Sequence, residues 1–171
     1  MNLAETVRAI PDKPIPGVMF RDITTTLQDP EALHEAIDQM CGLLKDVDFD
    51  LVVGSESRGF IFGVPIAYAM HKGFVPVRKP GKLPYKVISK EYSLEYGTDK
   101  LEMHIDAIKP GQKVVIVDDL IATGGTSKAM IELIEEAGGV VVDTAFFIEL
   151  SSEFDCKGAL APYPVHSVLQ Y

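Results

Sequence analysis

The residues with the greatest capacity for chemistry lie in one short run, residues 114–126. Four β-branched residues come first and predict a buried strand over 114–117, and two adjacent carboxylates, Asp118 and Asp119, follow at its end. A turn of small residues then leads into a predicted helix. Ligands of open α/β sheets bind outside the carboxyl ends of the strands, so we expect a binding site at this point of the chain.

The turn after the carboxylates has the composition of an anion site. Glycines at 124 and 125 let backbone N–H groups approach a ligand, the helix N-terminus adds its dipole, and threonines supply hydroxyl donors. We expect a terminal phosphate here, in a turn that is neither a Walker A loop nor a Gly-x-Gly-x-x-Gly dinucleotide motif. The residues of this turn, which are the candidates for binding the phosphate, are Ala122, Thr123, Gly124, Gly125 and Thr126.

The two aspartates need a different ligand group, because a carboxylate beside a phosphate repels it. Carboxylates accept hydrogen bonds from hydroxyl groups, so a sugar diol next to the phosphate would satisfy both residues. We therefore interpret Asp118, Asp119 and the turn as a cradle for ribose 5-phosphate. The alternative is a strand that ends in two solvated aspartates, with the glycines only closing a turn.

Strands alternate with helices around this run. Apolar strands are predicted over residues 51–54, 73–77 and 140–150, and helices over residues 60–71 and 126–137. The alternation predicts an α/β fold with a mostly parallel central sheet flanked by helices, in a single domain over residues 1–171.

The first thirty residues are rich in proline and show little periodicity. Within them, residues 14–22 are interpreted as an ordered loop rather than a strand or helix. Asp29 and Pro30 then open a helix, as its N-cap and its first residue. The predicted apolar face of this helix consists of Leu33, Ile37, Met40 and Leu44.

A polar stretch, residues 78–110, separates the second and third strands. Its first part holds a group of basic residues: Arg78, Lys79, Lys82, Lys86 and Lys90. The later part, residues 86–108, is predicted to be a hairpin or mobile flap with no segment that packs as a core strand. The basic group is suited to an anionic ligand, although charge runs are often ordinary solvated surface.

Composition and charge exclude several classes of protein. The chain has 171 residues, 47% of them hydrophobic and 24% charged, with a formal net charge of −9. The hydrophobic and charged fractions are close to the averages of globular proteins. The negative net charge argues against broad binding of nucleic acid. No apolar run approaches a membrane span and no export signal is visible, so we expect a cytoplasmic protein. Cys41 and Cys156 lack metal-ligand spacing and are expected to be reduced thiols.

Residues 114–126 resemble the phosphoribosyl pyrophosphate (PRPP) motif of the type I phosphoribosyltransferases. Further runs resemble the adenine-specific members of that family and follow the same order along the chain. These runs are residues 16–23, 56–63, 77–84, 92–97 and 169–171. The resemblance implies the type I phosphoribosyltransferase fold, with an N-terminal base-binding hood over residues 1–30, a flexible flap over residues 86–108, and a homodimer.

The activity implied by this resemblance is transfer of the 5-phosphoribosyl group from PRPP to N9 of adenine, which gives AMP and pyrophosphate. Mg²⁺ would accompany PRPP rather than occupy a cage of protein ligands, and Asp118 and Asp119 would bind the ribose hydroxyls. The implied pyrophosphate-binding residues are Arg58, Arg78, Lys79 and Lys82. The implied adenine-binding residues are Met19, Phe20 and Arg21. Catalysis would depend on Glu95, on the flap, together with Arg58 and Asp119.

Each of these roles has an alternative in ordinary structure. Arg58 could be a salt-bridge partner at a helix start, Phe20 a hydrophobic anchor, and Glu95 a residue that only shapes the pocket. Two other functions also fit the cradle: transfer to another purine base, such as hypoxanthine, guanine or xanthine, and sensing of PRPP by a DNA-binding regulator. The regulator is disfavoured, because the first thirty residues show no helix-turn-helix pattern and the net charge is strongly acidic.

Overall fold

The computed structural model describes residues 1–94 and 97–171. The chain divides into two compact units, residues 1–39 and residues 40–171, and each is described by itself.

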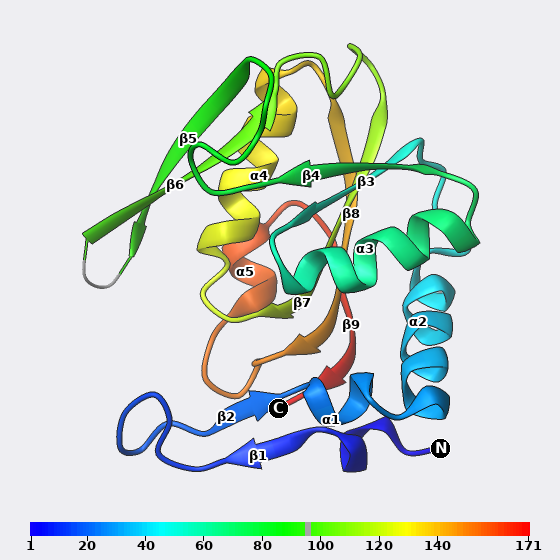
Figure 1. The fold of residues 1–171 in the computed structure, drawn as a ribbon, viewed down its shortest axis with the longest axis vertical. Coiled ribbons are helices and arrows are strands. Elements are labelled where there is room, and N and C mark those ends of the chain that lie inside the picture. The colour runs from blue at the N-terminus through cyan, green and yellow to red at the C-terminus, as the bar shows by residue number, and fades with distance from the viewer. Residues whose placement is uncertain (95–96) are drawn as a thin grey trace. The chain divides into compact units, whose positions relative to one another are not determined.

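The larger unit is built on a parallel sheet, which has five strands in the described residues (Figure 1). In spatial order the strands are β4 (Gly73–Val77), β3 (Leu51–Ser55), β7 (Lys113–Ile121), β8 (Val140–Glu149) and β9 (Val165–Gln170). The predicted α/β fold with a parallel central sheet is confirmed. The edge strand β9 is an addition that the sequence patterns did not predict.

Among the described residues of this unit, three helices lie wholly within it: α3 (Arg58–Ala69), α4 (Gly125–Glu136) and the short α5 (Cys156–Leu160). α3 links β3 to β4, and α4 links β7 to β8, so the two connections run in opposite directions from the middle of the sheet. Right-handed crossovers then place α3 and α4 on opposite faces of the sheet. In the part of the chain that the structure describes, no helix is both long and apolar enough to cross a membrane.

The central strand β7 is apolar on both faces, as a parallel strand covered by helices requires. Its residues Val114, Val115, Ile116 and Val117 are all fully buried. β7 extends beyond the predicted strand to Ile121, so the two aspartates belong to the strand itself and share its fixed backbone.

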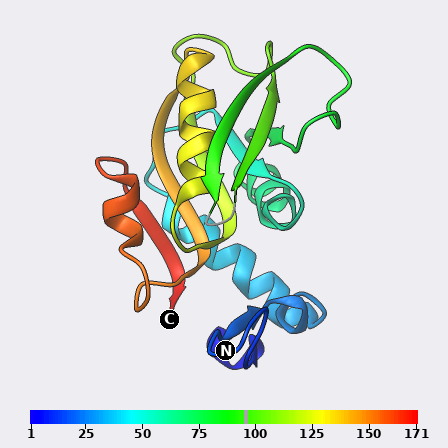
Figure 2. The ribbon, with the colours of Figure 1, turned by 90° about the vertical axis from the view of Figure 1, so that its left-hand side faces the viewer.

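Between β4 and β7 the chain forms an antiparallel hairpin of β5 (Val87–Leu94) and β6 (Gly97–His104), as predicted. The expectation that none of it packs as a core strand is wrong, because Leu101 and Met103 are buried in the main hydrophobic cluster. Alternate residues of β6 are buried, and α4 lies between this hairpin and β8 (Figure 2). The hairpin is therefore anchored to the core through its second strand.

Before residue 30, the smaller unit consists of short elements. They are the 3₁₀ helix η1 (Leu3–Thr6), the antiparallel strands β1 (Arg8–Ile10) and β2 (Phe20–Asp22), and the one-turn helix α1 (Thr24–Leu27). The interpretation of residues 14–22 as a loop is therefore wrong for its last three residues. They form a strand because β1 supplies their backbone partners, and local composition does not reveal a partner so distant in sequence.

The long helix α2 (Pro30–Leu44) begins where it is predicted. Asp29 caps it, because its Oδ1 accepts hydrogen bonds from two backbone N–H groups of the first turn, at 3.0 and 3.3 Å. Its buried face consists of Ala32, Ala36, Met40 and Leu44. Leu33 and Ile37 are only half-buried, since the two alanines occupy the centre of that face.

Replacement of Met103 by alanine tests the anchoring of the hairpin. Met103 is fully buried, so Met103→Ala should lower the free energy of unfolding by about 2–5 kcal/mol in urea titrations. Ile105→Ala, two residues further on and 44% exposed, is the control and should change it by less than about 0.5 kcal/mol. Equal effects of the two variants would show that β6 does not belong to the core.

Candidate active site

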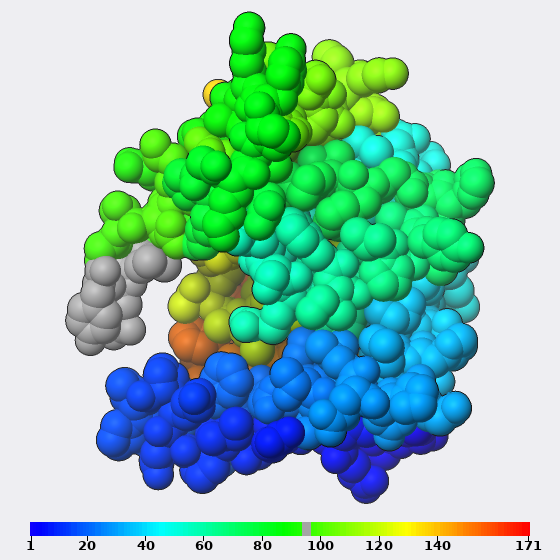
Figure 3. Space-filling model, viewed as in Figure 1, coloured from blue at the N-terminus to red at the C-terminus, as the bar shows by residue number. Residues whose placement is uncertain are grey.

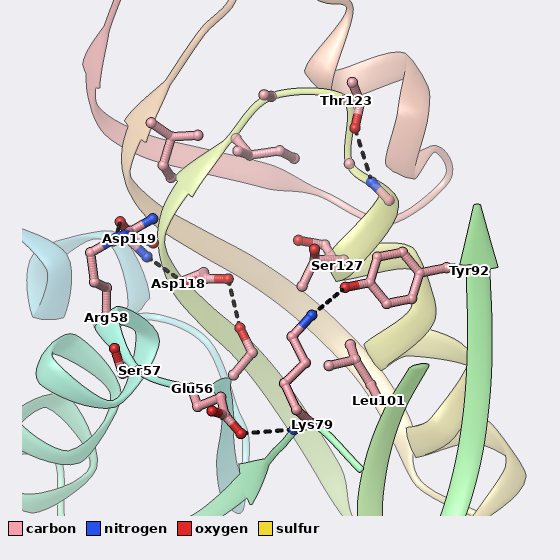
Figure 4. A pocket seen from close by; sticks show the side chains of 17 residues that line it. Glu56, Ser57, Arg58, Lys79, Tyr92, Leu101, Asp118, Asp119, Thr123 and Ser127 are labelled. Atoms are coloured by element: carbon pink, nitrogen blue, oxygen red, sulfur yellow. Dashed lines mark hydrogen bonds and ion pairs between the residues drawn. The ribbon is translucent and has the colours of Figure 1, made fainter. Parts of the chain in front are cut away.

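A pocket of about 310 Å³ opens at the carboxyl ends of β3 and β7 (Figure 4). It is lined by residues 55–58 at the end of β3, by residues 118–127 at the end of β7, and by three further side chains, Lys79, Tyr92 and Leu101. β3 and β7 are neighbours in the sheet, so both loops open onto one edge. This is the position that the sequence predicts for a ligand.

Asp118 is almost fully buried in β7, and both of its carboxylate oxygens accept hydrogen bonds. The hydroxyl of Ser55 donates to Oδ2 at 3.0 Å, and the backbone N–H of Asp119 donates to Oδ1 at 2.8 Å. Burial, followed by the charge of Asp119, raises the pKa of Asp118 well above its usual value. The carboxyl group is thus an acceptor held in fixed geometry, which suits recognition of sugar hydroxyls.

Asp119 pairs with Arg58, the first residue of α3. The Nε of Arg58 donates to Oδ2 of Asp119 at 2.7 Å, and the Arg58 side chain is 60% exposed whereas that of Asp119 is 11% exposed. The structure therefore brings together a residue predicted to bind pyrophosphate and one predicted to bind ribose. Arg58 also forms the salt bridge at a helix start that was the alternative to a ligand-binding role. This salt bridge holds a residue that lines the pocket.

The turn between β7 and α4 has the backbone that the two glycines predict. Gly124 has φ +87° and precedes the first residue of α4, and a Cβ on it would lie 3.0 Å from Cβ of Ala159. Glycine therefore meets both a conformational and a steric requirement at this position. The Thr123 hydroxyl accepts a long hydrogen bond of 3.5 Å from the backbone N–H of Gly125. All five predicted phosphate-binding residues line the pocket.

Glu56 organises the basic segment that follows β4, and sequence reasoning missed it. Its carboxylate accepts hydrogen bonds from Arg78 Nε at 3.2 Å, from the backbone N–H of Lys79 at 2.7 Å, and from Lys82 Nζ. Burial acts to raise the pKa of Glu56, but these donors and the charges of Lys82 and Arg78 outweigh it and lower the pKa. The sequence signal that could have identified Glu56 is its position as an acidic residue directly after a buried strand.

Of the four predicted pyrophosphate-binding residues, Arg58 and Lys79 line the pocket, whereas Arg78 and Lys82 are held beside it by Glu56. The Lys79 ammonium group donates to the hydroxyl of Tyr92 at 3.2 Å and to a carboxylate on β6. Tyr92 begins one of the runs that resemble the family, and its place in the pocket was not predicted.

The residues predicted to read the base lie in the smaller unit. Phe20 and Arg21 belong to β2, and Met19, which is 40% exposed, precedes that strand. Glu95 falls outside the described residues. The adenine-binding and proton-transfer roles of these residues therefore stay predictions.

Comparison with known proteins places the chain in a class and then in a family. Residues 25–155 match the phosphoribosyl transferase domain family. The adenine phosphoribosyltransferase of Acetivibrio thermocellus is 58% identical, and the alignment covers all of both chains. The chain therefore belongs to the phosphoribosyltransferases and, among them, to the adenine phosphoribosyltransferase family.

Solved structures agree with this assignment. The adenine phosphoribosyltransferase of Thermoanaerobacter pseudethanolicus superposes with a TM-score of 0.95 at 47% identity, over 99% of this chain and 98% of that chain. The enzyme of Saccharomyces cerevisiae, solved with an iminoaltritol bisphosphate and adenine, gives a TM-score of 0.88 at 37% identity, over 95% and 94% of the two chains. The type I phosphoribosyltransferase fold extends over essentially the whole chain.

The raised pKa of Asp118 predicts a pH-dependent gain in stability for Asp118→Asn. A carboxyl group whose pKa is raised on folding stabilises the protein below its unfolded value of about 4 and loses that contribution as the pH rises. The neutral amide avoids this loss and has the same shape. Its free energy of unfolding should match the native value near pH 4 and exceed it progressively as the pH rises above about 4 in urea titrations. A difference independent of pH would show that the Asp118 carboxyl is not destabilised by burial.

Proposed function

We propose that the chain transfers the 5-phosphoribosyl group of PRPP to N9 of adenine, releasing pyrophosphate and forming AMP. The observation that carries the proposal is the union, in one pocket, of the buried acid pair and the glycine turn at the end of β7. The turn would bind the 5′-phosphate through backbone N–H groups, because they point out of the helix N-terminus. Asp118 and Asp119 would accept hydrogen bonds from the ribose hydroxyls.

The diphosphate of PRPP would lie against the basic side of the same pocket. Arg58 and Lys79 line it, and Glu56 holds further positive charge close by. These groups would stabilise the negative charge that develops on the leaving pyrophosphate. Most of the catalysis would come from positioning the reacting atoms and neutralising charge.

The base would be read by the N-terminal segment, and a proton would move through Glu95. Phe20 would stack on the purine, with backbone groups of Met19 and Arg21 at its edge. Support for this part comes from the family resemblance of residues 16–23 and 92–97 and from the relatives' shared specificity for adenine.

We expect Mg²⁺ to enter with the substrate. In the described residues, no three side chains of His, Cys, Asp or Glu are grouped to hold a metal ion. Mg²⁺ prefers several water and phosphate oxygens with only one or two carboxylates, and the site offers two buried carboxylates beside the expected diphosphate. When bound, the ion would supply positive charge that stabilises pyrophosphate as a leaving group.

The assay that tests the proposal offers PRPP and Mg²⁺ with adenine, hypoxanthine, guanine or xanthine and measures nucleotide formation. We expect AMP from adenine and no nucleotide from the other bases. Product from another base would contradict the assignment of the base-reading residues. Binding of PRPP without turnover of any base would instead favour the PRPP-sensing regulator.

The residue roles are tested in the same assay with Asp119→Asn and Arg58→Ala. Each variant should lower kcat/KM by roughly 10²-fold, the scale observed when one charge-stabilising group is removed from an active site. Asp106→Asn removes the same charge from an exposed loop and should leave turnover unchanged. Near-native rates for both pocket variants would remove the site assignment.

We also propose that the protein is a homodimer whose interface includes α3. This helix lies on the face shown in Figure 3 and carries exposed apolar side chains at helical spacing, with Ile61 38%, Val64 47% and Tyr68 88% exposed. Exposed apolar stripes of this kind mark association surfaces. Sedimentation equilibrium should return a dimer, and Val64→Glu should return a monomer, whereas Lys45→Glu on an exposed turn should not. A native chain that sediments as a monomer at micromolar concentration would overturn this.

A further inference from the structure

We infer that Tyr92 and Asp99, on the two strands of the β5–β6 hairpin, are positioning residues that hold the ammonium group of Lys79 at the diphosphate side of the pocket. The inference rests on the proposed function, because that function gives Lys79 its ligand. It assigns the two described strands of the hairpin a role in binding PRPP.

The contacts form a closed triangle of side chains. The Nζ atom of Lys79 donates to the Tyr92 hydroxyl at 3.2 Å and to Oδ2 of Asp99, and the Tyr92 hydroxyl donates to the same oxygen at 3.4 Å. Tyr92 and Asp99 are directly opposite each other in the antiparallel register. Opposed residues project from the same face of a hairpin, so both side chains reach Lys79 together.

Lys79 is fixed at both of its ends. Its backbone N–H donates to Glu56 Oε1 at 2.7 Å, so the start of the side chain is tied to the loop after β3 (Figure 4). Its ammonium group is tied to the hairpin, and it lies 5.7 Å from the centre of the Tyr92 ring. Two elements far apart in sequence therefore determine where one charge lies in the pocket.

The Tyr92 ring also reaches the opposite side of the pocket. A Cβ on Gly125, the first residue of α4, would lie 3.8 Å from Cδ2 of this ring. The ring thus spans the distance between the phosphate-binding turn and the ammonium group of Lys79. The ring therefore lies between the turn proposed to bind the 5′-phosphate and the lysine proposed to bind the diphosphate.

Holding Lys79 in place favours anion binding for two reasons. A lysine side chain loses much rotamer freedom when it binds a ligand, and contacts made beforehand reduce that loss. An ammonium group has three donors, so two held by Tyr92 and Asp99 leave one for a diphosphate oxygen. Burial acts to lower the pKa of Lys79, but the hydrogen bonds to Asp99 and Tyr92 outweigh it and raise the pKa, which keeps the group charged.

Two single-site variants weaken this triangle of contacts. Tyr92→Phe deletes the hydroxyl, which contacts both Lys79 and Asp99, and Asp99→Asn removes the negative charge and one acceptor oxygen. Each should raise the KM for PRPP and the dissociation constant of pyrophosphate with Mg²⁺ by roughly 3- to 10-fold, the usual effect of losing one hydrogen bond. The KM for adenine should not change, because neither residue is assigned to the base.

The control is Glu91→Gln on the same hairpin. Glu91 is exposed, precedes Tyr92 and so projects from the other face of β5, and its replacement changes the net charge by the same amount as Asp99→Asn. This variant should keep native constants. Thermal unfolding of all variants is measured alongside, and either Tyr92→Phe or Asp99→Asn tests the inference alone if the other fails to fold.

A third variant, Lys79→Met, shows whether the effects pass through the lysine. In that background, Tyr92→Phe and Asp99→Asn should cause no further loss of pyrophosphate binding, because residues that act through a shared partner are not additive. Losses that persist without Lys79 would overturn the inference, as would native binding in the two single variants. Native PRPP binding in Lys79→Met would instead refute the role of Lys79 in the proposed function, and AMP formation is scored separately.

Discussion

The site depends on two carboxyl groups buried side by side at the end of a parallel strand. Water would solvate both groups far better than the sheet does, so Asp118 and Asp119 are retained only because neighbours supply hydrogen bonds and charge. The Ser55 hydroxyl and a backbone N–H satisfy the first, and Arg58 satisfies the second. The acid pair therefore depends on two features of the fold. β3 lies next to β7 and supplies Ser55, and α3 begins three residues after β3 and supplies Arg58.

An acidic protein that binds a polyanion needs its positive charges in fixed places. The chain carries a formal charge of −9, yet its pocket holds Arg58 and Lys79, and each of these bases has an acidic partner. Glu56 has the same relation to Arg78 and Lys82. These acids keep long, flexible side chains from dispersing into solvent, and they hold the charges where an arriving diphosphate meets several donors together.

Sequence patterns predict the parts of this fold that depend on residues close together in the sequence. The apolar runs locate β3, β4, β7 and β8, and the acid pair with its glycine turn locates the pocket. The patterns fail where a residue depends on a distant partner. Residues of β2 form a strand through β1, Leu101 is buried by the core beneath the hairpin, and Asp99 matters through Lys79, twenty positions earlier. No local pattern encodes those pairings.

The site separates two kinds of recognition. The turn at residues 122–126 would bind phosphate through backbone groups, which depend on the αL glycine at 124 and on the start of α4 rather than on any particular side chain. The predicted base-reading residues, around Phe20, belong to the smaller unit. Their strand, β2, pairs with β1 of the same unit. On the proposed function, a change of base specificity would fall on these residues and leave the buried acids and the turn unchanged. The PRPP motif is common to several base specificities, whereas the runs that resemble the adenine-specific members lie elsewhere in the chain, residues 16–23 and 92–97 among them.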